Sequence, residues 1–296
     1  MNEPKSSESP KIRQSAKSQS QFMKLGCYAL VAYLLLWAVI YSPLYRMIVL
    51  QPDRQESSLY NTDKILGAKR QEFFIDSHGE KLHAWMFCKP GSKVLVIIHH
   101  GNGGNILNRL FLAKSFIQAG ASVLLYDYRG YGKSSGELSP GYLPEDGLIV
   151  FDFAKNNFKY PITINYGESI GSGVACIVDK ERKADALILQ SGITMLPNVA
   201  KDGVAIFKLF PSFMWPQPQF NNCELLANSK TPLLVLHGER DKLVPCSHSQ
   251  CLFDSAGTTD KAFIKLPNCG HNDVGYYDPD LFQKAVEDFL ARWKTN

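Results

Sequence analysis

Ser169, Asp241 and His271 are the residues of this chain whose types and order point to a chemical reaction. Ser169 lies in the stretch Gly-Glu-Ser-Ile-Gly, and the aspartate and the histidine follow it, each shortly after a strand-like run. A serine hydroxyl becomes an effective nucleophile when a histidine takes its proton and a carboxylate orients that histidine. We therefore predict that Ser169 attacks an acyl carbonyl, that His271 is the base and that Asp241 orients it.

The segments beside Ser169 predict a sharp turn from a strand to a helix. Residues 162–166 are strand-like, residues 172–178 are helix-like, and glycines lie two positions before and after the serine. Glycines at these positions let the backbone pass close to its neighbours. The N–H of Ile170 would lie at the helix N-terminus, where developing negative charge is stabilised. Ile170 is therefore the first predicted oxyanion donor.

A glycine-rich loop after the apolar run 94–99 is the predicted source of the second oxyanion donor. The loop reads His100-Gly101-Asn102-Gly103-Gly104 and lacks the Lys-Ser/Thr pair of a phosphate-binding P-loop. In a parallel sheet, such a loop reaches the same edge as the serine turn. We assign the donor to the N–H of Asn102 and expect His100 to pack beneath the loop.

The predicted acid and base each have a competitor. Glu239 lies closer than Asp241 to the end of the run 233–236, so it stays an alternative acid. His271 follows the run 262–266, whereas His248 falls in a helix-like stretch. Because catalytic loops converge at the strand ends of an open parallel sheet, His271 is the better base.

Strand-like and helix-like segments alternate along most of the chain, which predicts a mostly parallel α/β sheet with helices on both faces. The segment 192–230 breaks this alternation, because it holds four prolines among aromatic residues. We interpret it as a short lid that adds apolar wall to the site, with an ordinary helical insertion as the alternative. The expected strands are 72–75, 82–87, 94–99, 122–126, 162–166, 186–189, 233–236 and 262–266, and the expected helices are 105–119, 143–156, 172–183 and 281–293.

The N-terminal part of the chain predicts a membrane anchor. Residues 1–21 are polar and are expected to be disordered, whereas 25–45 carry no charge and lie between Lys24 and Arg46. At about 1.5 Å per residue, such a segment matches the ~30 Å apolar core of a bilayer. We therefore predict a transmembrane signal anchor at 22–46, a linker at 47–68 and a catalytic domain at 69–296. A buried core helix and a cleaved signal peptide are the alternatives.

Charge suggests an orientation for this anchor. The chain has a net charge of +4, of which +3 falls in residues 1–24, so basic residues precede the apolar segment. The positive-inside rule then predicts a cytoplasmic N-terminus and a catalytic domain on the opposite side of the membrane. The remainder is close to neutral, which gives no indication of a nucleic-acid partner.

The seven cysteines show neither a C-x-x-C pair nor the spacing of a zinc site. We expect buried free thiols, and disulfides stay an alternative if the domain is exported. No metal and no organic cofactor is implied.

Several motifs together resemble the α/β-hydrolase superfamily over about residues 68–294. They are His100-Gly101-Asn102, residues 127–136 (DYRGYGKSSG), the serine turn, residues 237–241 (HGERD) and residues 270–273 (GHND). The chain looks most similar to membrane-attached serine esterases and thioesterases of this superfamily, some of which remove palmitoyl groups from proteins. The resemblance implies the α/β-hydrolase fold, the triad Ser169, Asp241 and His271, and the oxyanion pair Asn102 and Ile170. In one respect the chain departs from the depalmitoylating members: it has an apolar span and no cysteine before Cys27.

The sequence thus predicts a membrane-anchored serine hydrolase that cleaves a carboxylic ester or thioester of an acyl, lipid-like substrate through an acyl-enzyme. A serine peptidase or amidase is the first alternative, and a hydrolase-fold ligand receptor with little turnover is the second. A haloalkane dehalogenase is disfavoured, because the turn carries Ser169 and not an aspartate.

Overall fold

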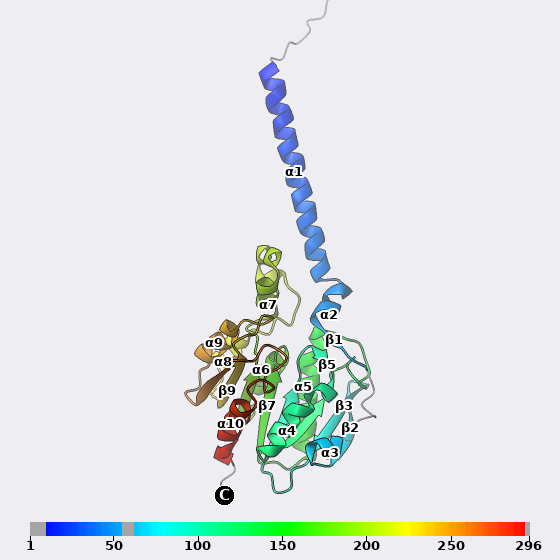
Figure 1. Ribbon diagram of the computed structural model, residues 1–296. Helices are drawn as coiled ribbons and strands as arrows, with labels where there is room; N and C mark the ends of the chain where they lie inside the picture. Colours follow the sequence, from blue (N-terminus) through cyan, green and yellow to red (C-terminus); the bar gives the residue numbers. More distant parts are fainter. Residues whose placement is uncertain (1–9, 55–61, 294–296) are drawn as a thin grey trace, which may run out of the picture.

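An eight-stranded sheet organises most of the chain in the computed structural model, which describes residues 10–54 and 62–293 (Figure 1). The strand order is β10-β9-β8-β7-β4-β6-β3-β2. All neighbours from β10 to β6 are parallel, whereas β3 and β2 are antiparallel additions at one edge. The mostly parallel sheet predicted from the sequence is therefore confirmed. The strands are β2 (Arg70–Ser77), β3 (Glu80–Phe87), β4 (Val94–His99), β6 (Ser122–Tyr126), β7 (Ile162–Glu168), β8 (Ala186–Gln190), β9 (Leu233–Gly238) and β10 (Lys261–Leu266).

Helices cover both faces of this sheet because successive strand residues point to opposite sides. In β4, Val94, Val96 and Ile98 face one core, while Leu95 and Ile97 face the other. This double coverage explains why the central strands are continuous apolar runs. One face carries α3 (Thr62–Leu66), α4 (Leu110–Gln118) and α10 (Pro279–Leu290), and the other carries α5 (Leu143–Asn157), α6 (Gly171–Arg182), α8 (Asn222–Ala227) and α9 (Cys246–Ser255).

A long helix, α1 (Pro10–Ile40), projects away from the domain (Figure 1). The structure differs here from the expected disorder of residues 1–21, because the helix already begins at Pro10. Proline suits the first turn of a helix, and neither proline nor glycine interrupts the chain before Gly26. Extending an existing helix costs far less than nucleating one, so the polar residues continue it. Residues 1–9 lie outside the described part of the chain.

Within the described residues, one helical stretch is long and apolar enough to cross a membrane, Gln19–Ile40. Most of its side chains are exposed, so this segment is not a core helix of the domain. The short helix α2 (Pro43–Val49) follows it and leads into the domain. The domain boundaries at residues 46 and 68 remain a prediction.

The residues after α2 hold the site loop in place instead of forming only a polar linker. β1 (Gln51–Pro52) pairs in parallel with β5 (Gly103–Gly104). The N–H of Gln51 donates to the carbonyl of Asn102 at 2.9 Å. The segment that leaves the apolar helix is therefore hydrogen-bonded to the loop predicted to bind an oxyanion.

The first part of the segment 192–230, up to about residue 215, lies over the carboxyl ends of the sheet strands, beside the base of α1 (Figure 1). It contains α7 (Leu196–Gly203), the 3-10 turns η4 (Ala205–Leu209) and η5 (Ser212–Met214), and α8. We call residues 192–215 the lid.

All seven cysteines are free thiols. Sγ of Cys223 in α8 lies 3.1 Å from Sγ of Cys251 in α9.

Candidate active site

The turn between β7 and α6 holds Ser169 in a strained conformation. Its φ of 54° lies in the left-handed region that non-glycine residues rarely adopt. The two flanking glycines make this turn possible. A Cβ on Gly167 would lie 2.6 Å from the carbonyl oxygen of Gly171, and a Cβ on Gly171 would lie 2.1 Å from the carbonyl oxygen of His99. The turn therefore needs glycine at both positions, as the sequence pattern indicates.

The structure brings Ser169, His271 and Asp241 into one hydrogen-bonded line. The hydroxyl of Ser169 lies 3.0 Å from Nε2 of His271, and Nδ1 of His271 lies 2.7 Å from Oδ2 of Asp241. A carboxylate accepts, so Nδ1 carries the proton and Nε2 is free to accept the serine proton. This is the tautomer that a general base requires.

Asp241 is held as an ionised acceptor. Its Oδ1 accepts the N–H groups of Leu243 (2.9 Å) and Val244 (2.8 Å), and Nε2 of His237 lies 3.3 Å from Oδ2. Burial by itself raises the pKa of Asp241, but hydrogen bonds from His237 and His271 outweigh it and hold the pKa well below its usual range. The alternative acid, Glu239, is exposed, and within the described residues its side chain makes no hydrogen bond to His271.

Asn102 and Ile170 line the same cavity as Ser169. Across the described ranges, neither backbone N–H donates to another protein group. The orientation of the Asn102 N–H follows from His100, whose Nδ1 lies 2.7 Å from the carbonyl oxygen of Gly101. Because N–H and C=O point in opposite directions across a trans peptide, this contact directs the Asn102 N–H away from His100.

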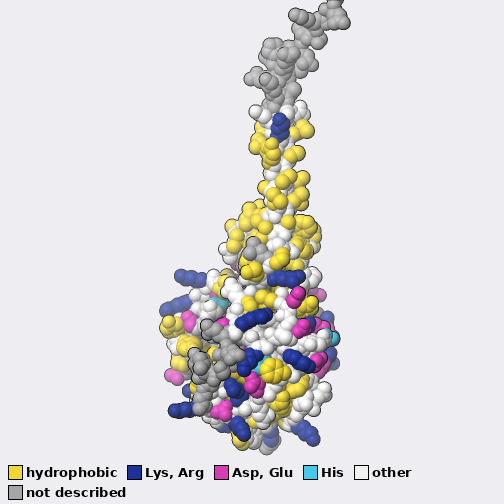
Figure 2. Space-filling model, turned by 90° about the vertical axis from the view of Figure 1, so that its right-hand side faces the viewer, with side chains coloured by type: hydrophobic (Ala, Val, Ile, Leu, Met, Phe, Trp, Pro, Cys, Tyr) yellow, Lys and Arg dark blue, Asp and Glu magenta, His cyan; other side chains and the backbone are white. Residues whose placement is uncertain are grey.

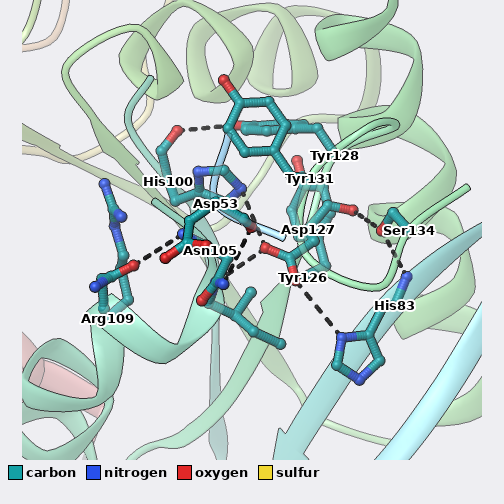
Figure 3. Close-up of polar contacts among 12 residues, drawn as sticks. Asp53, His83, His100, Asn105, Arg109, Tyr126, Asp127, Tyr128, Tyr131 and Ser134 are labelled. Carbon is teal, nitrogen blue, oxygen red and sulfur yellow. Dashed lines mark hydrogen bonds and ion pairs between the residues drawn. The ribbon is translucent and has the colours of Figure 1, made fainter. Parts of the chain in front are cut away.

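The loop that carries Asn102 rests on a buried cluster of aromatic and charged side chains (Figure 3). The His100 ring lies against Tyr128 and Tyr131, and the Tyr128 hydroxyl donates to the carbonyl of His100 at 3.2 Å. Burial, with the nearby charge of Arg109, lowers the pKa of His100 to about 4, so it is neutral at pH 7. His100 thus packs beneath the loop, as predicted.

A buried ion pair connects this loop to the serine turn. Nε of Arg109 donates to Glu168 at 2.8 Å and Nη2 at 3.1 Å, and Glu168 also accepts the N–H of Gly101 at 3.3 Å. Arg109 donates from Nη1 to the carbonyl of Gly103 at 2.5 Å. Burial raises the pKa of Glu168, but Arg109 outweighs it and lowers the pKa below its usual value. The pair fixes the two predicted oxyanion donors relative to each other.

A cavity of about 270 Å³ opens beside Ser169 and is almost wholly apolar. Besides Asn102, Ser169 and Ile170, its walls come from α2, the lid and the loop after β9. Among the residues that the structure describes, no Asp, Glu, Lys or Arg lines it. The lining residues include Ile48 and Val49 of α2, Ile193, Leu196, Val199 and Phe207 of the lid, and Leu243 and Val244. Such a cavity suits an acyl chain better than a charged group.

Three features of the site were missed from the sequence. The first is His237, whose ring lies 3.3 Å from Asp241. From the sequence it looks like an ordinary residue at the end of a strand, although its position four residues before the predicted acid could have indicated this contact. The Arg109–Glu168 pair joins residues 59 positions apart and left no local pattern. The contribution of α2 to the cavity was hidden because residues 47–68 were interpreted as a linker.

Comparison with known proteins gives the family. A family model described as "Serine aminopeptidase, S33" (Hydrolase_4) matches residues 90–228. The protein bem46 of Schizosaccharomyces pombe is 33% identical over 219 residues, which is 70% of this chain and 70% of that protein. The chain belongs to the α/β-hydrolase superfamily. The lysophosphatidylserine lipase ABHD12 of mouse is 32% identical over 67% of this chain, but the match spans only 56% of that lipase.

Solved structures confirm the α/β-hydrolase fold. An esterase from Pyrococcus furiosus superposes with a TM-score of 0.70 over 83% of this chain and 98% of that chain, at 21% identity. The Est1E protein of Butyrivibrio proteoclasticus, in a structure with bound ferulic acid, superposes with a TM-score of 0.63 over 74% of this chain and 98% of that chain, at 20% identity. At these identities, the likeness carries the fold alone.

Proposed function

We propose that this α/β-hydrolase is a membrane-anchored serine hydrolase that cleaves a carboxylic ester or thioester of an acyl, lipid-like substrate. The observation that carries the proposal is the hydrogen-bonded line from Asp241 through His271 to Ser169. The Ser169 end of this line faces an apolar cavity. The similarity to a lysophosphatidylserine lipase supports ester chemistry as the class of reaction.

In the proposed mechanism, Ser169 Oγ attacks the carbonyl carbon while its proton passes to Nε2 of His271. The resulting oxyanion is bound by the N–H groups of Asn102 and Ile170, which costs little reorganisation because both are already held in place. His271 then gives the proton to the departing alcohol or thiol. Water, deprotonated by His271, attacks the acyl-enzyme and releases the acid and Ser169.

Anchoring and orientation are part of this proposal. The stretch Gln19–Ile40 has the length of a membrane span, and basic residues precede it. We therefore place the N-terminus in the cytoplasm and the catalytic domain on the opposite side. Protease protection of a C-terminal tag in sealed cytoplasm-facing-out vesicles tests the orientation: the tag is protected if it is right and is digested if it is wrong.

Active-site labelling and ester turnover test the catalytic assignment. We expect the full chain in detergent to react with a fluorophosphonate probe and to hydrolyse p-nitrophenyl esters, with a preference for medium or long acyl chains. Ser169→Ala should lose both signals, whereas Ser247→Ala, at an exposed serine of α9, should keep both. A folded parent protein that neither labels nor turns over any ester contradicts the proposal and favours the receptor alternative.

A serine aminopeptidase is the second candidate, because the matching family model carries that description. Binding of a peptide N-terminal amine calls for a nearby carboxylate, and no acidic residue in the described part of the chain lines the cavity beside Ser169. The lining therefore favours an acyl group. Release of p-nitroaniline from aminoacyl anilides at a higher kcat/KM than from any acyl ester would reverse this preference.

A further inference from the structure

One face of α1 packs against the lid instead of facing outward. Side chains at helical i, i+3, i+4, i+7 spacing are partly or wholly covered, and those between them are exposed. Ile40, Phe210 and Trp215 are buried together at the centre of this contact. The covered residues of α1 are Tyr33, Leu36, Trp37 and Ile40, and the exposed ones include Leu34, Leu35 and Val39.

Polar contacts fix the lid against this face. The Tyr33 hydroxyl lies 3.3 Å from the carbonyl of Leu209, and Nε1 of Trp37 donates to the carbonyl of Met214 at 2.9 Å. The rings of Tyr33 and Phe210 stack with centroids 4.6 Å apart. Irregular backbone is tolerated inside a bilayer only where other protein groups satisfy it, and α1 supplies such donors to the 3-10 turns of the lid.

The position of these contacts along α1 gives the depth of the lid. Tyr33 lies seven residues before Ile40, the end of the membrane-length stretch. At 1.5 Å per residue, the lid residues that touch Tyr33 lie about 10 Å inside that end. If α1 crosses a bilayer, the tip of the lid is therefore at the depth of the acyl chains.

The outer surface of the lid has the composition expected at that depth. Phe213 is 83% exposed and Leu209 60% exposed, and Val204 and Ile206 are also exposed. Lys208 is the only charged residue in the stretch 204–215, and its long side chain can reach toward the head groups. In Figure 2, apolar side chains of α1 continue into an apolar collar where the helix meets the domain, and charged side chains lie below it.

The same structural unit forms the wall of the acyl cavity. Phe207 lines the cavity and also packs into the cluster with α1, where its ring lies 5.4 Å from that of Trp215. Ile48 and Val49 of α2, which begins three residues after α1 ends, also line the cavity. The apolar cavity is thus bounded in part by the lid, which packs on α1, and by α2, which follows α1 in the chain.

We propose that the C-terminal half of α1 and the lid form one membrane-inserted unit, so that the cavity beside Ser169 receives acyl chains directly from the lipid bilayer. The partner is the acyl region of the membrane that α1 crosses, because the apolar lid surface continues that of the helix. This inference rests on the membrane-anchored hydrolase proposed above and names the source of its substrate.

Depth-dependent quenching tests the insertion without any use of catalysis. The full chain is reconstituted in phosphatidylcholine vesicles with lipids brominated on the acyl chains, and tryptophan is introduced as Phe213→Trp or Leu209→Trp. We expect the fluorescence added by either substitution to be quenched at least twofold. Phe74→Trp, at an exposed phenylalanine of β2, is the matched control and should add unquenched fluorescence. Added fluorescence at both lid positions that is no more quenched than at position 74 overturns the inference.

Substrate presentation gives a second readout. Phe213→Asp places a charge on the lid surface and is expected to slow hydrolysis of a long-chain ester in vesicles about tenfold, with unchanged hydrolysis of a soluble acetate ester. Phe74→Asp should alter neither rate. Equal rates for Phe213→Asp and the parent on both substrates would contradict uptake from the bilayer.

The two proposals fail in different ways. Quenching at the lid positions without fluorophosphonate labelling of Ser169 would reject the hydrolase and leave the inserted lid standing. Labelling and ester turnover without quenching would reject the inserted lid alone.

Discussion

The two sides of the active site differ in the interactions that hold them: polar contacts on the side of the sheet and apolar packing on the side of the lid. On the sheet side, Ser169, Asp241 and His271 sit at strand ends and are held by short polar contacts of 2.7–3.0 Å. On the lid side, the wall is apolar, irregular in backbone and packed on α1 through aromatic rings. Polar networks specify one geometry because an unpartnered buried group is costly, whereas apolar contacts tolerate displacement. We infer that the sheet side determines whether an acyl bond is broken, and the lid side determines which acyl chain arrives.

The largest expected effect is on the sheet side, at Asp241. Asp241→Asn keeps the shape but favours the wrong tautomer of His271, so kcat should fall about 10⁴-fold. Steady-state ester hydrolysis measures it, with Glu239→Gln as the control at the exposed alternative acid. A large loss with Glu239→Gln and none with Asp241→Asn would transfer the acid role to Glu239.

The next effect concerns the ion pair between Arg109 and Glu168. Arg109→Met leaves a buried carboxylate without its partner, which should lower the free energy of unfolding by about 3–5 kcal/mol. The oxyanion loop also loses its link to the serine turn, so kcat should fall while KM changes little. Arg182→Met is the matched control, because Arg182 pairs with Asp152 at the surface and its loss should change little. Urea unfolding and ester kinetics on the two variants check this, and equal behaviour of both would contradict it.

Acidification should act on the sheet side of the site, because the buried histidines His99 and His100 lie at the end of β4 and beneath the oxyanion loop. Burial lowers the pKa values of His99 and His100 to about 4. The unfolded chain takes up these protons near pH 6.5 and the folded chain only near pH 4, so stability falls as the pH drops through this window. The loss is at most about 3 kcal/mol for each histidine. His99→Gln should reduce the slope of unfolding free energy against pH, and an unchanged slope would rule out His99 as a source.

The same contrast explains what could be predicted from the sequence. The strands around the site were predictable because burial on both faces leaves continuous apolar runs, as at 94–99 and 122–126, whose predicted bounds match β4 and β6. The three residues of the hydrogen-bonded line were predictable because a glycine-flanked turn and loops at strand ends leave local signals.

The lid side could not be predicted in the same detail, because its geometry depends on contacts distant in sequence. Tyr33 and Trp37 contact residues 176 and 177 positions away. The sequence around them does not distinguish side chains that contact the lid from side chains that would contact lipid. The pairing of Gln51 with Gly103 is a two-residue bridge in a polar stretch, too short to leave a periodic signal. The polar residues 10–21 continue a helix whose apolar part lies beyond them, so their own composition was a poor guide.

The smallest expected effect is on the lid side, and it concerns selectivity and not catalysis itself. Val204 and Ile206 are about equally exposed on the lid, but Val204 also lines the cavity, whereas Ile206, two residues further along, is not among its described lining residues. Val204→Trp should fill space for about two methylene groups, which at about 0.8 kcal/mol each corresponds to a roughly tenfold loss in kcat/KM for long acyl chains. Hydrolysis of the acetate ester should be nearly unchanged, because the hydrogen-bonded line at Ser169 is not touched. Ile206→Trp adds a ring of the same size outside the cavity and should leave the chain-length profile as it is. A parallel loss on acetate and on long chains with Val204→Trp would show that the lid wall also positions Ser169 or its partners, and the division between the two sides of the site would then be wrong.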